Sequence, residues 1–303
     1  MNWSKYNTSL KKRGSLNLFV EENISEWWYA KEVNENCRPK KYSDKAIEVC
    51  INIRAFFRLP LRATEGLIES LFSKLELDLA VPSYTQVSRR LKLLKDQKLF
   101  FNKRKIFAIA IDSTGLKVYG EGEWKVRQHG ADKRRTWRKL HLAIDTASQE
   151  IRSFKLTKND VTDGAILKEL APQFQGRLNR ILGDGAYDQT GCYVSARKIG
   201  ARLIAPPRKK AKIQANLINP ALIDRDNAIS TIRRLGNDDE ARKQWKKSVG
   251  YYKRSLAETA MFRFKRIFGA HLQSRDFNNQ LAEVAMKVML FNRITKCGIP
   301  KNM

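Results

Sequence analysis

The sequence predicts a mixed α/β sheet domain with flanking helices, preceded by an all-helical N-terminal region. The chain has 303 residues, 42% of them hydrophobic, which is enough for a main domain with a sizeable core and smaller modules. Apolar side chains in residues 1–100 follow helical spacing, interrupted by polar breaks. From residue 106 onward, short apolar runs come first and then alternate with helical segments. That order is typical of a mixed sheet with its ligand site at strand ends.

The first 100 residues contain three helical segments with recognisable start signals. Ser43 can cap a helix that Pro60 closes, and a second segment covers residues 63–75. A third helix begins near Ser83 after a Val-Pro break, and its apolar residues repeat at helical spacing. We therefore expect a helical region whose segments are separated by polar breaks.

The helix that begins near Ser83 leaves a polar surface that includes Arg89 and Arg90. Together with the preceding segment, over about residues 60–95, it resembles a helix-turn-helix whose second helix enters a DNA major groove. A plain helical bundle with solvated arginines is the alternative. The charge of the chain favours DNA contact, because 59 Lys and Arg stand against 31 Asp and Glu, a net charge of +28.

Such a charge indicates a polyanionic partner, although a basic protein of the ribosomal or chromatin type would share it. No segment approaches the roughly 20 apolar residues of a spanning helix, and the N-terminus lacks the apolar core of a signal peptide. We expect a soluble, cytoplasmic chain with no membrane partner. The four cysteines lack C-x-x-C spacing, so neither a zinc site nor a disulfide framework is expected.

Short apolar runs predict the strands. Residues 106–112 end at Asp112, and residues 114–119 continue after a Ser-Thr-Gly break, as in a hairpin. A later brief strand ends at Asp184. The remaining elements are expected as strands at 137–145, 151–156 and 201–205, and as helices at 162–170 and 189–199.

Two basic stretches interrupt this pattern. Residues 206–250 contain 11 basic and 5 acidic residues with little amphipathic order, which indicates a loop or a small insertion. Within it, Trp245 could stack on an unpaired DNA base. Residues 125–139 hold seven positive charges and are interpreted as a loop that follows DNA phosphates, or as a solvated hairpin.

Four functional residue types share one short helical stretch: Tyr251, Arg254, Glu258 and Lys265. At about 100° per residue, their offsets place the four side chains within an arc of about 60°. Apolar residues cluster on the opposite side, which is typical of an amphipathic helix that covers a core. A long amphipathic helix is expected to follow at residues 276–294.

Glu258 could form a metal site together with Asp112 and Asp184, each of which lies at the C-terminal end of a predicted strand. Transfer at a phosphodiester can use two divalent ions about 4 Å apart, one on the attacking oxygen and one on the leaving oxygen. Mg²⁺ and Mn²⁺ prefer hard oxygen ligands, so the three carboxylates could form such a site. A strand-end turn residue is the alternative for each aspartate alone. Three other aspartates receive only that interpretation: Asp145, Asp163 and Asp188.

The run Y-x2-R-x3-E-x6-K that contains Glu258 occurs in order with AIDSTGLKVYG around Asp112 and LGDGAYD around Asp184. This combination resembles the bacterial DDE transposases of the insertion sequence five family, over essentially the whole chain. The resemblance implies an RNase H-like catalytic domain over residues 104–296, with residues 206–250 as a basic insertion. It also implies that Asp112, Asp184 and Glu258 form a metal-binding catalytic triad.

The activity that the resemblance implies has two steps, with two Mg²⁺ ions per site for which Mn²⁺ can substitute. Water cleaves double-stranded DNA at the terminal inverted repeats of the element, and the freed 3′-hydroxyl then attacks target DNA. Arg254 and Lys265 would contact phosphates near the cut, and Tyr251 would help to position the strand. Each of these three could also be an ordinary solvated or packing residue.

Two other functions remain open from the sequence. One is a structure-selective nuclease on the same fold, which cuts without joining. The other is a non-catalytic helix-turn-helix regulator. For a transposase, bringing two DNA ends together makes a homo-oligomer, at least a dimer on DNA, the expected assembly.

Overall fold

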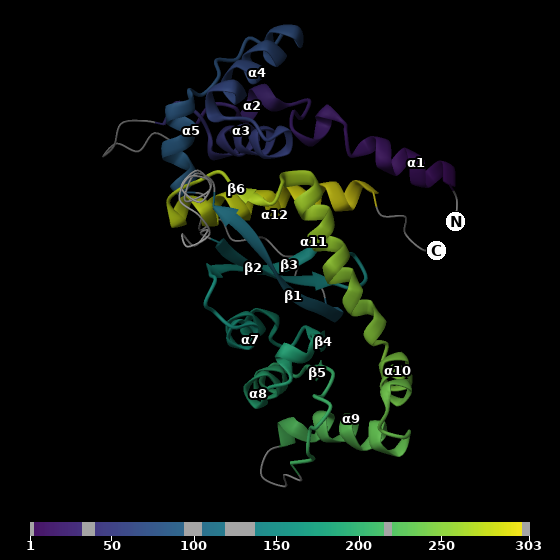
Figure 1. The fold of residues 1–303 in the computed structure, drawn as a ribbon. Helices are drawn as coiled ribbons and strands as arrows, with labels where there is room; N and C mark the ends of the chain where they lie inside the picture. Colours follow the sequence, from purple (N-terminus) through teal and green to yellow (C-terminus); the bar gives the residue numbers. More distant parts are fainter. Residues whose placement is uncertain (1–2, 32–39, 94–104, 119–136, 215–219, 299–303) are drawn as a thin grey trace, which may run out of the picture. The chain divides into compact units, whose positions relative to one another are not determined.

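The computed structural model describes residues 3–31, 40–93, 105–118, 137–214 and 220–298. The chain divides into two compact units (Figure 1). Met1–Leu99, Lys117–Thr136 and Phe264–Met303 form the first unit, and Phe100–Leu116 with Trp137–Arg263 forms the second. The C-terminal residues are thus grouped with the N-terminal helices. The predicted boundaries, 1–100 and 104–296, stay a prediction.

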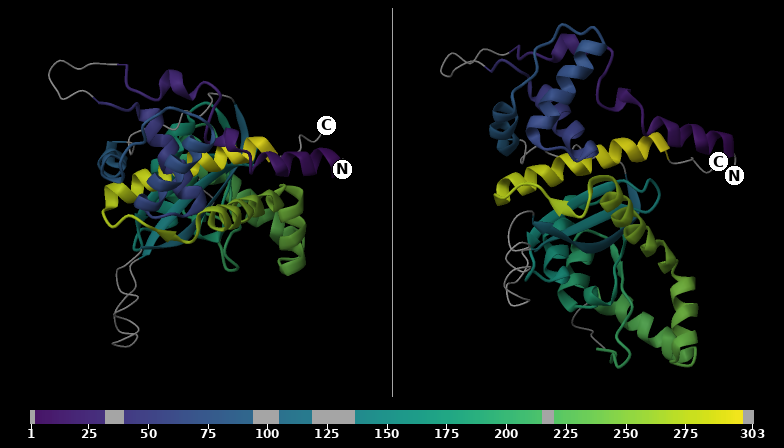
Figure 2. Two further views of the ribbon diagram at one scale, coloured as in Figure 1. Left: turned by 90° about the horizontal axis from the view of Figure 1, so that it is seen from above. Right: turned by 45° about the horizontal axis from the view of Figure 1, so that its top comes forward.

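The first unit is mainly helical. Its helices are α1 (Trp3–Lys12), α2 (Ile24–Trp27), α3 (Asp44–Phe57), α4 (Leu61–Lys74), α5 (Tyr84–Leu91) and α12 (Phe277–Gly298). The long helix α12, yellow in Figure 2, packs against α1, α3 and α5. The predicted helices of the N-terminal region and the predicted long C-terminal helix are therefore present.

Local capping decides where two of these helices begin. The Ser43 side chain accepts a hydrogen bond from the backbone N–H of Ala46, and Ser83 forms a capping box with Gln86. Both helix starts are as predicted. The connection from α4 to α5, residues 75–83, is longer than the three- or four-residue turn of a helix-turn-helix. The helix-turn-helix assignment stays a prediction.

The second unit contains the sheet. Its strands are β1 (Ile106–Val118), β2 (Trp137–Asp145), β3 (Ile151–Lys158), β4 (Leu178–Leu182) and β5 (Arg202–Ile204), in the order β3-β2-β1-β4-β5. β2 and β3 are antiparallel, whereas β4 is parallel to both β1 and β5. Together with its flanking helices, this mixed sheet confirms the predicted mixed α/β fold.

β1 is one continuous strand, so the predicted hairpin with a break after Asp112 is wrong. Its first half, from Ile106 to Ala110, pairs with β4, and its end at Lys117 and Val118 pairs with β6 (His271–Leu272). Both halves find backbone partners, which keeps the Ser-Thr-Gly segment extended in spite of its turn-like composition.

Helices α7 (Asp163–Leu170) and α8 (Thr190–Lys198) pack side by side on the sheet (Figure 1). Buried residues from both helices join β1, β4 and β5 in one apolar cluster. This cluster includes Ile109, Leu167, Ile181, Ala196 and Leu203. The core therefore supports the strands that precede Asp112 and Asp184.

The basic insertion is not a loop, which corrects one of the two readings of residues 206–250. It contains α9 (Ile223–Arg234) and α10 (Asp239–Ser248), which pack on each other. All five acidic residues of the segment lie at helix starts, and basic residues fill the last turns. This distribution suits the helix dipole and was the available signal for two helices.

One further helix, α11 (Ser255–Phe268), follows the short 3₁₀ helix η6 (Tyr251–Arg254). Its buried face is apolar, as predicted, and consists of Ala257, Ala260, Met261, Phe264 and Phe268. Within the described ranges, no helix is long and apolar enough to cross a membrane.

Candidate active site

Parallel pairing of β1 and β4 brings the two predicted aspartates to neighbouring positions. Ala110 is aligned with Leu182, so Asp112 and Asp184 each follow two residues beyond an aligned pair. Asp184 follows the end of β4, as predicted. Asp112 lies inside β1 and not at its end, because the strand continues to Val118. The register, rather than the strand ends, accounts for their proximity.

Asp112 is half-buried and has a distinct partner at each oxygen. The backbone N–H of Ser113 donates to Oδ1 at 2.8 Å, and Arg254 Nη1 donates to Oδ2 at 3.1 Å. Burial, with the charges of Asp184 and Glu258, raises the pKa of Asp112, while its two donors oppose this rise. The three carboxylates therefore lie within electrostatic range of one another.

Asp184 caps the short 3₁₀ helix η4 (Gly185–Tyr187). Its Oδ1 accepts a hydrogen bond from the backbone N–H of Ala186 at 2.9 Å. The preceding residue, Gly183, accepts a hydrogen bond at its carbonyl from the Tyr251 hydroxyl at 3.1 Å. The backbone next to Asp184 is thus fixed from both sides.

Glu258 lies in the first turn of α11, with 56% of its side chain exposed. Arg254 forms an ion pair with Glu258 and another with Asp112. One guanidinium therefore bridges two of the three predicted metal ligands.

The four-residue motif is not carried by a single α-helix, which corrects that prediction. Gly250 adopts a left-handed conformation (φ 69°) and starts the 3₁₀ helix that holds Tyr251 and Arg254. Only Glu258 and Lys265 lie on α11, so the 100° arithmetic applies to these two alone. Lys265 is half-buried, and burial lowers its pKa.

Tyr251 uses its hydroxyl within the protein, and burial raises its pKa to about 12. The predicted contacts of Tyr251, Arg254 and Lys265 with DNA stay predictions.

Trp245 does not present a free ring, so the predicted stacking on a DNA base does not fit the structure. Its side chain is 5% exposed and packs against Ala228, Ile232 and Ala241 in a small core of α9 and α10. A ring in this position stabilises the insertion instead. Most of the basic stretch 125–139 lies outside the described residues.

The two arginines of α5 differ from each other. Arg90 donates to the Tyr42 carbonyl at 2.5 Å and pairs with Asp44, so its predicted DNA contact is replaced by contacts inside the first unit. Arg89 is exposed, and its contact with DNA stays a prediction.

Asp163, which we interpreted as a turn residue, is part of a polar cluster next to the site. Its Oδ1 lies 3.0 Å from Lys139 Nζ and 3.2 Å from His141 Nδ1. Burial alone would raise the pKa of Asp163, but the nearby polar groups of His141, Lys139 and Ser113 lower it to about 2. Because these partners are distant in sequence, nothing local indicated the cluster.

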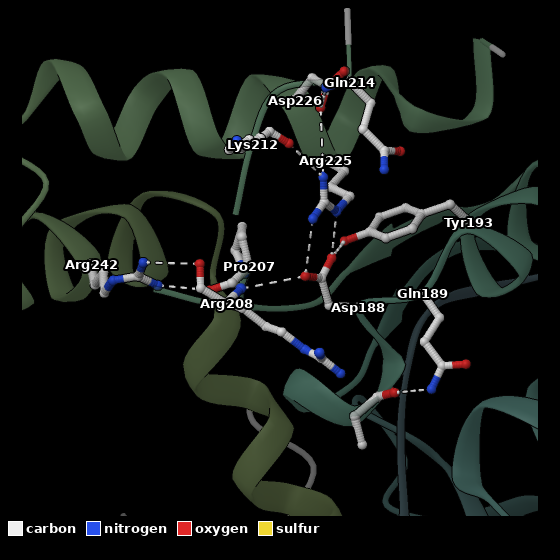
Figure 3. A network of polar contacts seen from close by, with 11 residues as sticks. Asp188, Gln189, Tyr193, Pro207, Arg208, Lys212, Gln214, Arg225, Asp226 and Arg242 are labelled. Carbon is white, nitrogen blue, oxygen red and sulfur yellow. Dashed lines mark hydrogen bonds and ion pairs between the residues drawn. The ribbon is translucent and has the colours of Figure 1, made fainter. Parts of the chain in front are cut away.

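Asp188 belongs to a second network, which joins the turn after Asp184 to the insertion (Figure 3). Its carboxylate accepts from Arg225 Nε at 2.7 Å, from the Tyr193 hydroxyl at 3.2 Å and from the Arg208 backbone N–H at 3.3 Å. Arg225 also donates to the Lys212 carbonyl at 3.1 Å. This network connects α8, α9 and the segment that precedes α9.

The carboxylates suit a divalent cation in chemistry but do not yet converge. Hard oxygen ligands from Asp112, Asp184 and Glu258 are the type that Mg²⁺ and Mn²⁺ prefer. Among the described residues, however, no three His, Cys, Asp or Glu side chains are close enough to hold an ion. Arg254 takes one oxygen of Asp112 and one of Glu258, so a bound cation would have to replace it.

Comparison with known proteins gives two family matches, each to a transposase DDE domain. One covers residues 11–121 and the other residues 104–293, more than half of the chain. Similar solved structures include the piggyBac transposase synaptic complex with hairpin DNA, with 9% identity, 100% of this chain and 79% of that chain covered, and a TM-score of 0.41. The Drosophila P element transposase strand transfer complex has 13% identity, 92% and 70% coverage, and a TM-score of 0.32.

Both TM-scores are low, so the assignment depends on the family matches. The match over residues 104–293 includes Asp112, Asp184 and Glu258. The chain therefore belongs to the DDE transposase family and is an enzyme of DNA transposition.

Proposed function

We propose that this transposase binds the terminal inverted repeats of its own insertion sequence, cleaves the DNA there and joins the 3′-hydroxyl ends to target DNA. We place it in the insertion sequence five family, near the transposase of insertion sequence nine-oh-three, and expect it to act in the bacterial nucleoid. One observation is the main support. The register of β1 and β4 places Asp112 and Asp184 each two residues beyond the aligned pair Ala110 and Leu182, and Arg254 links Asp112 to Glu258.

Asp112, Asp184 and Glu258 are the residues that would hold Mg²⁺, with Mn²⁺ as a substitute. Bound ions would activate the attacking oxygen and stabilise the leaving oxygen of the phosphodiester. Two backbone hydrogen bonds orient two of these carboxylates. Ser113 N–H orients one oxygen of Asp112, and Ala186 N–H orients one oxygen of Asp184. Arg254, once replaced by a cation, is free to bind a DNA phosphate.

The charge of the chain and two basic residues support contact with double-stranded DNA. The net charge of +28 favours binding to the phosphate backbone. Arg89 on α5 is exposed, and Lys265 lies in the last turn of the helix that carries Glu258. Joining two ends in one reaction requires at least two catalytic sites, so we expect at least a dimer on DNA.

The test is cleavage of a duplex that carries one end of the element, with Mg²⁺ present. We expect wild-type protein to nick at the end and Asp112→Ala to give no product. Asp160→Ala is the matched control, because Asp160 is an exposed aspartate in the same unit. Equal cleavage by wild type and Asp112→Ala would contradict the proposal.

Adding target DNA separates the competing functions. Joined products support a transposase, whereas broken ends alone indicate a structure-selective nuclease. Glu258→Gln addresses the regulator hypothesis, because a non-catalytic regulator would keep its full activity in cells without this carboxylate.

A further inference from the structure

Tyr187 is the last residue of the 3₁₀ turn that Asp184 caps. The side chain is 1% exposed, and its ring lies against Gly183 so closely that a Cβ there would be 2.7 Å from the ring carbon Cδ2. Only glycine allows this approach. The ring therefore packs directly on the backbone that positions Asp184.

The hydroxyl of Tyr187 is buried and, among the described residues, has no hydrogen-bond partner. Leaving a buried hydroxyl without a partner is unfavourable. Burial and the charges of Asp163, Asp112 and Asp184 raise the pKa of Tyr187 far above its ordinary value. The hydroxyl thus keeps its proton and is available as a donor near three acceptor side chains.

Tyr193 provides the contrast within the same unit. It is also buried, with 2% exposed, but its hydroxyl donates to Asp188 at 3.2 Å. Phenylalanine at position 187 would fill the same space as Tyr187 without an unpaired oxygen. The retained hydroxyl indicates a partner beyond those that the described residues supply.

We infer that Tyr187 is a positioning residue of the metal centre, whose hydroxyl donates a hydrogen bond to the oxygens around a bound divalent cation. Those oxygens are the carboxylates of Asp112 and Asp184 or a water that the cation holds. This inference rests on the proposed metal-dependent function. Asp112 and Asp184 would hold the cation in place of the Arg254 contact, and the Tyr187 hydroxyl would then fix the orientation of their carboxylates.

The experiment measures Mn²⁺ binding to the full-length protein without DNA, from the electron paramagnetic resonance signal of free Mn²⁺. For Tyr187→Phe we expect the Mn²⁺ Kd to rise about ten- to a hundredfold, as for other partners of metal ligands. The Tm of the metal-free variant should stay unchanged or rise, since an unpaired hydroxyl is removed. Tyr193→Phe should lower the Tm and leave the Kd unchanged.

Each other result has a defined meaning. An unchanged Kd for Tyr187→Phe, or an equal rise in both variants, overturns the role of Tyr187 while the metal centre stands. If wild type does not bind Mn²⁺, or if Asp112→Ala binds Mn²⁺ as well as wild type, the proposed metal centre is contradicted. The role of Tyr187 is then contradicted with it.

Discussion

Asp184 and Asp188 lie four residues apart on one turn and have opposite environments. The side chain of Asp188 is 1% exposed and receives donors from Arg225, Tyr193 and Arg208. Asp184 is half-buried and accepts a hydrogen bond from the backbone N–H of Ala186. The Asp188 carboxylate is therefore saturated with donors and holds structural elements together. The Asp184 carboxylate keeps acceptor capacity for a ligand.

A similar difference separates Asp163 from Asp112. Asp163 forms an ion pair with Lys139 and lies 3.2 Å from His141 Nδ1, and both partners belong to β2. Asp112 depends on Arg254, a side chain on a short 3₁₀ helix that also pairs with Glu258. A carboxylate whose partner can move is suited to exchange that partner for a cation.

Substitution of Asp184 tests the unsaturated side of this comparison and has the largest expected effect. Asp184→Asn removes a metal ligand, so we expect DNA cleavage to fall by at least about a thousandfold. The Tm should remain close to that of wild type, because one capping hydrogen bond to Ala186 N–H can still form. Measured nicking rates with Mg²⁺ and a thermal melt check both parts; a large drop in Tm would mean that Asp184 is structural.

Substitution of Asp188 tests the saturated side. Asp188→Asn leaves the buried Arg225 guanidinium with only its longer ion pair to Asp226, at 3.8 Å, which should lower the free energy of unfolding by about 3 kcal/mol. Asp224→Asn is the control, because Asp224 pairs with the largely exposed Arg202, and such pairs contribute at most about 1 kcal/mol. Urea denaturation measures both, and equal losses would contradict the distinction.

Asp163 makes a pH-dependent contribution to stability. Its pKa is lowered to about 2 in the folded protein, from an ordinary 3.8. Its stabilising effect is therefore complete above about pH 5 and is mostly lost by about pH 2. Asp163→Asn should be less stable than wild type at pH 6, and the difference should disappear near pH 2. A difference in unfolding free energy that does not change with pH would rule out this role.

Arg254 gives the smallest expected effect. If it competes with a cation for Asp112 and Glu258, Arg254→Gln should bind Mn²⁺ more tightly in the absence of DNA. The gain should be about fivefold at most, since partly exposed ion pairs contribute up to about 1 kcal/mol. Titration of both proteins with Mn²⁺ measures the change. Weaker binding by the variant would show that Arg254 orients the carboxylates instead of competing for them.

Sequence alone determined most of the elements of this protein and pointed to its three candidate carboxylates, but it missed the continuity of β1 and the helices α9 and α10. Ser43 and Ser83 cap their helices through contacts three residues away, and apolar periodicity depends on near neighbours. The spacing of the Glu258 motif, in order with the two aspartates, was enough to identify the DDE transposase family. These signals are local, so they can be read without a fold.

Only the tertiary structure decided which polar groups have partners. Asp188 and Arg225 are 37 residues apart, and Asp112 and Arg254 are 142 apart, so no local pattern could reveal either pair. The burial of Trp245 likewise depends on how α9 packs on α10. Whether a carboxylate is saturated or available depends on donors brought together by folding, and that difference separates Asp184 from Asp188.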